Sequence, residues 1–278
     1  YLPRKFKIAI AIPPSNDVDV FSNDIGLIAI IKDGQLKGFN IAIGGGLATT
    51  HGNPNTYSRL ATIIGFTDTE AKTLKAVYEV LTIQRDYGNR SDPKLSRLKY
   101  TVDKLGVDNF KKELEKRIGF ALLPEESYAF TERNDRYGWQ ENYENKWFYT
   151  LFVEHGVIKS YQKQFLYELA QLQISDFRFT CNQNLILGEI SAANKEKVTA
   201  LIAKYKIEEQ DSAMRKSSMA CVAMPTCPLA LAEAQRYLPE LVTKIEPFLK
   251  KYDLEQDEIS IRMTGCPNGC GRPYLAEI

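Results

Sequence analysis

Short apolar runs of strand length dominate the N-terminal part of the chain. Residues 5–12 begin with alternating lysines and continue as isoleucine and alanine up to two prolines, which predicts a strand that ends there. The apolar runs 25–32 and 35–43 flank Asp33 and Gly34, a pair typical of a tight hairpin turn. We therefore predict a sheet in this region.

Three consecutive glycines, 44–46, follow the predicted hairpin. Their backbone amides could cradle a phosphate or a carboxylate, or the segment could form a simple turn. No Lys-Ser/Thr pair ends the segment, so it is not a nucleotide-binding P-loop. Both the cradle and the turn stay open from the sequence.

Helical signals begin after this region. Thr67 and Glu70 have the spacing of a capping box, which predicts a helix up to about Tyr87. Further along, the pattern predicts strand 147–153, helix 163–173, strands 176–181 and 184–190, helix 193–205, helices 228–236 and 239–251, and strand 257–263. The elements between 147 and 205 resemble half of a ferredoxin-like unit. Because strands and helices mix without strict alternation, we predict an α+β fold.

Changes in sequence character predict three regions. Residues 1–136 form part of an α+β domain, residues 137–209 form the half ferredoxin-like unit, and residues 210–278 begin a domain with most of the cysteines. The first residue is Tyr1 rather than methionine, and the last residues read like the middle of a protein. We therefore expect an internal fragment of a longer protein.

Composition and charge exclude several classes of partner. The 278 residues contain 36 Lys and Arg against 35 Asp and Glu, so no overall field attracts nucleic acid or an anionic membrane. No apolar run is long enough to span a bilayer. The stretch 84–117 is locally basic, and such a run is usually a solvated face; the alternative is that a few of its residues line an anionic cofactor.

Four of the five cysteines form two close pairs, Cys221 with Cys227 and Cys266 with Cys270. An odd number of cysteines in a long chain argues against a secreted disulfide framework. Four thiolates from two loops suit an iron–sulfur cluster or zinc. The first gap is wide for zinc, and the glycines and prolines around the pairs favour the cluster. Zinc and unrelated buried thiols remain the alternatives.

The other cysteine and the two histidines give weaker signals. Cys181 is predicted to be a small buried residue on a strand. His155 lies in a Glu-His-Gly turn, which predicts a surface position, and His51 is left unassigned. Neither histidine has a cysteine or carboxylate at ligand spacing, so the sequence gives neither a metal-binding role.

Lys5 and Lys7 are two positions apart on the first predicted strand. Side chains at this spacing point to the same face, about 6.5 Å apart along the chain. Taken alone, such a pair usually marks a solvated face. Two cations on one face would also suit an anionic substrate, whose charge they would neutralise.

The segments around both cysteine pairs, 218–230 and 264–272, together with the start 1–7, resemble the sirohaem-containing sulfite and nitrite reductase family. The resemblance runs along the whole chain and is closest to the sulfite reductase haemoprotein (beta) branch. It implies that a [4Fe–4S] cluster is held by Cys221, Cys227, Cys266 and Cys270. It also implies that Cys270 bridges the cluster to sirohaem as the axial ligand of its iron.

The same resemblance assigns roles to basic residues. It implies that Lys5 and Lys7 bind the oxygens of sulfite over the distal face of sirohaem, and that Arg97 contacts the sirohaem. Lys7 favours sulfite as the substrate, because nitrite reductases of the family typically carry asparagine at the matching position.

The implied activity is a six-electron reduction of sulfite to sulfide in sulfur assimilation. The implied electron donor is an NADPH-dependent flavoprotein partner, with ferredoxin as the alternative, and redox-labile thiolates suggest the cytoplasm. A nitrite reductase of the same family and a non-catalytic module stapled by zinc are the rival functions. We expect the fragment by itself to lack tightly bound sirohaem and to be inactive.

Overall fold

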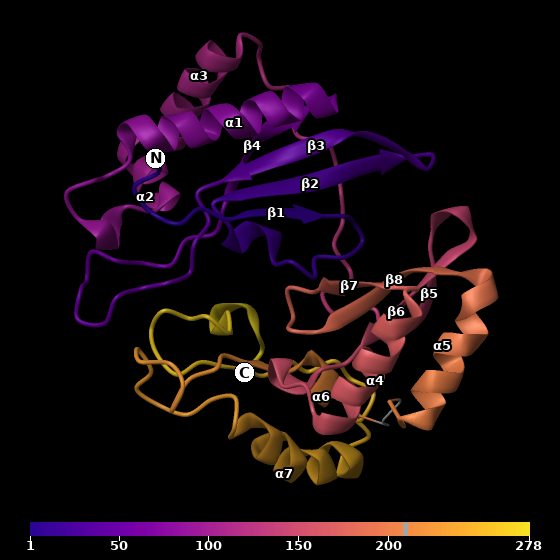
Figure 1. Cartoon of the computed structure of the whole chain (residues 1–278). Coiled ribbons are helices and arrows are strands. Elements are labelled where there is room, and N and C mark those ends of the chain that lie inside the picture. Colours follow the sequence, from indigo (N-terminus) through magenta and orange to yellow (C-terminus); the bar gives the residue numbers. More distant parts are fainter. Residues whose placement is uncertain (208–210) are drawn as a thin grey trace. The chain divides into compact units, whose positions relative to one another are not determined.

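The structure, a computed structural model of the chain, describes residues 1–207 and 211–278 (Figure 1). Its contacts divide into two compact units. The first unit comprises Tyr1–Arg133 and Pro267–Gly269, and the second comprises Asn134–Cys266 and Cys270–Ile278. The predicted boundary between residues 209 and 210 lies outside the described residues, and the division into three regions stays a prediction.

A four-stranded sheet forms the base of the first unit. Its strands lie in the order β1 (Ile8–Ala11), β2 (Ile25–Lys32), β3 (Gln35–Ile43) and β4 (Thr62–Thr67). β1 runs parallel to β2, whereas β2, β3 and β4 are antiparallel neighbours. The predicted hairpin is confirmed, and Asp33 and Gly34 both have the positive φ angles that such a turn requires, 55° and 71°.

β1 is shorter than the predicted strand, because Lys5 and Lys7 precede it. The Lys7 N–H donates to the Asp24 carboxylate at 2.8 Å and not to a strand carbonyl. The Lys7 carbonyl still accepts from the Ile25 N–H at 3.1 Å, so the backbone runs beside β2 before the strand begins. The predicted start of the strand at residue 5 is therefore wrong.

Helices of the first unit cover the sheet, and α1 lies along one of its faces (Figure 1). They are α1 (Glu70–Tyr87), α2 (Leu98–Leu105) and α3 (Val107–Ile118). The predicted bounds of α1 are confirmed, although its cap is Thr69, whose side chain accepts from the Lys72 N–H. The shared core is formed by Ile25, Ile41, Ile43, Ile64, Val80, Ile83, Leu98, Phe110 and Leu114. This burial fixes the glycine segment and the start of α2 beside the sheet.

The second unit contains a four-stranded antiparallel sheet with two helices packed on it. Its elements are β5 (Gly138–Glu141), β6 (Lys146–Leu151), α4 (Ser160–Leu172), β7 (Asp176–Phe179), β8 (Leu185–Ser191) and α5 (Ala192–Lys204), with the strand order β5-β6-β8-β7. Phe165 of α4 and Val198 of α5 are fully buried in the same core as Leu187 of β8. The α+β prediction is confirmed, and β5 is an addition to the predicted pattern.

A smaller hydrophobic cluster surrounds the C-terminal elements of the second unit. These are α6 (Ala213–Ser217), β9 (Met219–Ala220), α7 (Leu238–Lys251) and β10 (Arg262–Met263). The predicted helix 228–236 is wrong, because the N–H groups of Leu231 and Ala232 donate to the Gly265 carbonyl instead of along a helix. The predicted strand 257–263 shortens to β10, which pairs in parallel with β9.

Short 3-10 turns complete the described elements. They are η1 (Val20–Ser22), η2 (Pro93–Leu95), η3 (Tyr143–Asn145), η4 (Glu154–Gly156) and η5 (Pro273–Leu275). Across residues 1–207 and 211–278, no helix has the length and apolar character needed to cross a membrane.

Candidate functional site

The parallel pair of β9 and β10 brings the two cysteine-bearing segments together. Cys221 directly follows β9, and Cys266 comes three positions after Met263, the last residue of β10. The Cys221 N–H donates to the Met263 carbonyl at 3.1 Å and so continues the pairing beyond the strands. Because the strands are parallel, both segments leave the pair at the same end.

Hydrogen-bond donors are directed at the sulfur of Cys221. The Gly265 N–H lies 3.2 Å from Cys221 Sγ, and the Thr264 hydroxyl lies 3.6 Å from the same atom. N–H donors directed at a thiolate stabilise its negative charge and tune the potential of a bound iron–sulfur cluster. The environment of Cys221 therefore suits a metal-ligating thiolate.

Glycine is required where the two segments approach each other. A Cβ at Gly265 would lie 2.7 Å from both the Ala223 Cβ and the Ala232 carbonyl oxygen. A Cβ at Gly271 would lie 2.7 Å from the Met263 carbonyl oxygen. A larger residue at Gly265 would push the two segments apart, and one at Gly271 would push that residue away from β10. This close approach is the structural reason for the glycines beside the second cysteine pair.

All four predicted ligands belong to the second unit. Cys221, Cys227 and Cys266 are half-buried, and Cys270 is exposed. Among residues 1–207 and 211–278, no three Cys, His, Asp or Glu side chains are arranged to hold a single metal ion. The structure thus brings the segments together, while the convergence of four sulfurs on one cluster stays a prediction. Four soft thiolates fit iron–sulfur ligation.

Lys7, Asp24 and Arg97 meet in the first unit. Asp24 has no exposed surface, and Arg97 holds it through two hydrogen bonds, from Nε at 3.0 Å and from Nη2 at 2.8 Å. The Lys7 N–H donates to the same carboxylate, while the side chains of Lys5 and Lys7 are exposed. Two-point pairing with a buried carboxylate fixes the orientation of the Arg97 guanidinium.

The glycine segment forms neither an anion cradle nor a turn. Its amides already have backbone acceptors: Gly44 donates to Asp24, Gly45 to Asn23 and Gly46 to Arg59, at 2.8, 3.0 and 2.8 Å. An anion would have to displace all of these bonds. The segment instead continues from β3 beside residues 23 and 24, with Gly46 in an antiparallel bridge to Arg59, so neither possibility left open by the sequence is borne out.

Lys99 is a buried cation that the sequence analysis missed. Its side chain is almost fully buried, and Nζ donates to the carbonyls of Gly46 and Ala48, at 3.0 and 2.9 Å, and to that of Tyr57. Burial, together with the positive charge of Arg97, lowers the pKa of Lys99 to about 8. The predicted solvated face is therefore wrong at Lys99, which pins buried loops instead.

Two further predictions fail in the second unit. His155 is only 3% exposed, and neither ring nitrogen has a hydrogen-bond partner among the described residues, so its predicted surface position is wrong. Burial lowers the pKa of His155 to about 4. Cys181 is exposed in the turn after β7, not buried on a strand. The turn η4, which contains His155, contacts β9, and such long-range packing could not be inferred from local pattern.

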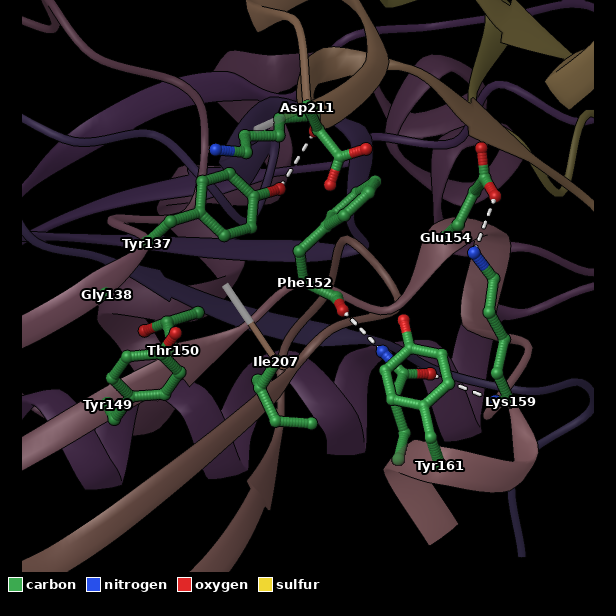
Figure 2. Close-up of a pocket in the computed structure, with 12 residues that line it drawn as sticks. Tyr137, Gly138, Tyr149, Thr150, Phe152, Glu154, Lys159, Tyr161, Ile207 and Asp211 are labelled. Carbon is green, nitrogen blue, oxygen red and sulfur yellow. Dashed lines mark hydrogen bonds and ion pairs between the residues drawn. The ribbon is translucent and has the colours of Figure 1, made fainter. Parts of the chain in front are cut away.

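A cavity of about 280 Å³ lies within the second unit, beside β6 and the start of α4 (Figure 2). Aromatic side chains dominate its wall, namely Tyr137, Tyr149, Phe152 and Tyr161. The Tyr137 hydroxyl donates to the Lys216 carbonyl at 2.8 Å. None of the cysteines lines this cavity, so it is separate from the candidate cluster ligands.

Comparisons with known proteins agree with this architecture. Residues 1–122 match the family model of the nitrite and sulphite reductase 4Fe-4S domain, and residues 140–205 match that of the nitrite/sulfite reductase ferredoxin-like half domain. Residues 1–122 contain none of the cysteines, so that domain's name does not by itself locate cluster ligands in this chain.

Similar proteins cover the entire chain. It is 55% identical to the sulfite reductase [NADPH] hemoprotein beta-component of Leptospira biflexa and 54% identical to that of Bacillus subtilis. Both alignments include 100% of this chain but only 51% and 50% of the relatives, so the chain spans about half their length.

A solved structure shows the same fold. The NirA protein of Mycobacterium tuberculosis superposes with a TM-score of 0.81 and 25% sequence identity, over 98% of this chain and 49% of that protein. The matched domains, the sequence relatives and this shared fold agree with one another. The chain belongs to the nitrite and sulfite reductase family.

Proposed function

We propose that this chain takes part in the six-electron reduction of sulfite to sulfide, as part of an oxidoreductase of sulfur assimilation. The observation that carries the proposal is the parallel β9–β10 pair, which delivers both cysteine segments to the same end. The similarity to two named sulfite reductase hemoprotein components supports the choice of reaction. In this proposal residues 1–136 belong to the sirohaem and substrate domain, and residues 210–278 begin the iron–sulfur domain.

The cysteines are the proposed metal ligands. A [4Fe–4S] cluster would be held by Cys221, Cys227, Cys266 and Cys270, and Cys270 would also help to hold the sirohaem. When bound, these groups supply electrons singly and a metal centre for sulfite. The Gly265 N–H donates to Cys221 Sγ and would hold that sulfur as a thiolate. The close contacts at Gly265 and Gly271 support this role by keeping the segments together.

The basic residues of the first unit are the proposed substrate and sirohaem contacts. Lys5 and Lys7 have exposed side chains on adjacent backbone, and we assign them the binding of sulfite oxygens. Their ammonium groups would neutralise the anion, stabilise charge as it accumulates, and donate protons. Arg97 would contact the sirohaem, with its guanidinium held in place by Asp24.

The electron donor in this proposal is an NADPH-dependent flavoprotein partner, and ferredoxin is the alternative. The printed names of the relatives, which include NADPH, support the first. We place the reaction in the cytoplasm, where reducing conditions preserve thiolate ligands.

The proposal is tested by comparing the turnover rates with sulfite and with nitrite as substrates. The purified holoprotein is supplied with a reduced low-potential dye, and sulfide and ammonia are quantified in parallel. We expect sulfide as the main product. Ammonia formed in preference to sulfide would assign the chain to nitrite reduction, and a protein that holds zinc and reduces neither anion would support the structural module.

A further inference from the structure

The turn 180–184, between β7 and β8, contacts the segment that carries the first cysteine pair. Gln183 Nε2 donates to the Ala220 carbonyl at 2.9 Å, and Ala220 is fully buried and directly precedes Cys221. The Gln183 Oε1 atom is buried without a partner among the described residues. The side chain is therefore kept at this position by its one bond to the cysteine segment, at the cost of an unsatisfied oxygen.

The same turn contacts the segment that carries the second pair. Arg272 lies two positions after Cys270, and its Nη2 donates to the Cys181 carbonyl at 2.9 Å and to Asn182 Oδ1 at 2.7 Å. Nη2 also lies 3.6 Å from the sulfur of Met219 in β9. One guanidinium thus joins the end of the second cysteine segment to the turn and to the strand that leads to Cys221.

A buried carboxylate holds the turn itself. Asp135, 9% exposed, accepts from the Thr180 hydroxyl at 2.6 Å, from Asn182 Nδ2 at 3.0 Å and from Asn184 Nδ2 at 2.8 Å. Asn184 Nδ2 also donates to the Tyr137 hydroxyl at 3.0 Å. A turn with this many satisfied side-chain bonds is a rigid support rather than a mobile loop.

The network continues to the helix before β9. Tyr137, which lines the cavity of Figure 2, donates from its hydroxyl to the Lys216 carbonyl at 2.8 Å. Burial raises the pKa of Tyr137, so its hydroxyl stays protonated as the donor. The segment between α6 and Cys221 is therefore held at both ends, by the bond from Tyr137 to Lys216 and by the bond from Gln183 to Ala220.

Backbone conformation shows that the two contact residues are held against a local preference. Gln183 and Arg272 both have left-handed backbone, with φ 68° and 54°. Side chains larger than glycine rarely adopt this region, and it is maintained only where surrounding contacts impose it. The contacts that impose it here are those between the turn and the two cysteine segments.

We propose that the turn 180–184 is a clamp that sets the spacing of the two cysteine segments, with Gln183 and Arg272 as its positioning residues. The clamp would place Cys221 and Cys270 correctly for cluster binding. This consequence rests on the proposed function. It extends the role of the ferredoxin-like half domain from a packing unit to a support of the metal ligands.

The test uses the holoprotein with Gln183→Met and Arg272→Met, which keep much of the side-chain bulk and remove the donors. Exposed residues in the same unit provide the matched controls Gln164→Met and Arg236→Met. Arg272→Lys, which retains a cation and a donor, is the conservative variant. Hydrogen exchange of the segments carrying Cys221 and Cys270 is measured after chelation of metal, and iron, acid-labile sulfide and the cluster midpoint potential are measured in the loaded protein.

We expect faster exchange in both segments and about tenfold weaker cluster retention or a shifted potential in the two donor-deleting variants. The controls should match the wild type, and Arg272→Lys should lie between. Wild-type exchange, retention and potential in both Gln183→Met and Arg272→Met would overturn the clamp and leave the proposed function standing. Faster exchange in a protein whose wild type never binds iron and sulfide would support the clamp and refute the proposed function.

Discussion

Burial determines the charge state of two side chains, Lys99 and His155. Each is almost completely enclosed, and in each the pKa is lowered because the charged form loses its hydration. Lys99 offsets this loss with three carbonyl acceptors, whereas His155 has no partner among the described residues for either ring nitrogen. The two residues therefore make different predictions about stability and pH.

For Lys99, stability should rise as the solution becomes more alkaline. The unfolded lysine binds its proton up to a pKa near 10.5, whereas the folded one releases it near 8. Between these values the unfolded state holds more protons, so raising the pH favours folding. We expect the wild type to gain about 2 kcal/mol relative to Lys99→Met between pH 7.5 and 9.5 in urea unfolding. Parallel pH profiles of the two proteins would contradict a buried, shifted lysine.

For His155, stability should fall in acid. The folded imidazole stays neutral down to about pH 4, whereas the unfolded one takes up a proton near 6.5. Acid therefore favours unfolding across this window. Asparagine tolerates the left-handed backbone of this position, where φ is 52°. Between pH 7 and 4.5, we expect the unfolding free energy of His155→Asn to fall by about 2 kcal/mol less than that of the wild type. Equal acid sensitivity would show that His155 is hydrated.

None of this burial was evident from the sequence. Lys99 lies in a basic stretch, His155 lies between charged and glycine residues, and Cys181, which is exposed, follows a strand in which charged residues alternate with phenylalanine. Whether such residues are covered depends on segments distant in the chain, such as the loop around Tyr57 for Lys99. Local pattern cannot report these contacts.

At the scale of elements, prediction succeeded where the deciding forces are local. The hairpin of β2 and β3 follows from turn chemistry, and α1 follows from apolar periodicity and a capping threonine. The false helix at 228–236 failed because long-range bonds to Gly265 replaced helical ones. The cysteine pairs were recognised by spacing, but their common location depends on the β9–β10 pairing, whose two strands are too short for the sequence to predict.

The contact between the cysteine segments gives a prediction for Gly265→Ala. The added Cβ would meet the backbone oxygen of Ala232 at 2.7 Å, which cannot move without displacing the segment. We expect a loss of about 1–3 kcal/mol in unfolding free energy, typical of overpacking, and reduced iron and sulfide content. Urea titration and metal analysis check both effects. A fully stable, fully loaded variant would show that the segments are not in close contact.

At the scale of the whole molecule, the proposed chemistry is divided between the two units. The proposed sulfite contacts belong to the first unit and the proposed cluster ligands to the second. Substitutions in the two units should therefore have different effects. Changes at the lysines of the first unit should alter turnover while the cofactors are retained, whereas changes at the cysteines should alter the cofactor content.

The lysines provide the first half of this test. In the holoprotein, Lys5→Ala or Lys7→Ala should lower sulfite turnover by about 10²-fold, because a charge-stabilising donor is removed, while iron and sirohaem content stays unchanged. Lys7→Asn should shift the ratio of sulfite to nitrite turnover toward nitrite. Arg4→Ala, an exposed neighbour, is the control. Unchanged sulfite turnover in both alanine variants would show that Lys5 and Lys7 are only solvated surface residues.

Iron and acid-labile sulfide content, measured together with the electron paramagnetic resonance spectrum after reduction, tests the central claim most directly. The comparison is between the wild-type holoprotein, Cys221→Ser and Cys181→Ser, since Cys181 is the cysteine outside the proposed ligand set. In the wild type and in Cys181→Ser, we predict a [4Fe–4S] cluster, which gives equal amounts of iron and sulfide once the sirohaem iron is subtracted. In Cys221→Ser, we predict that the cluster iron and sulfide are lost. Zinc in place of iron, or a cluster unaffected by Cys221→Ser, would contradict the assignment of the four cysteines.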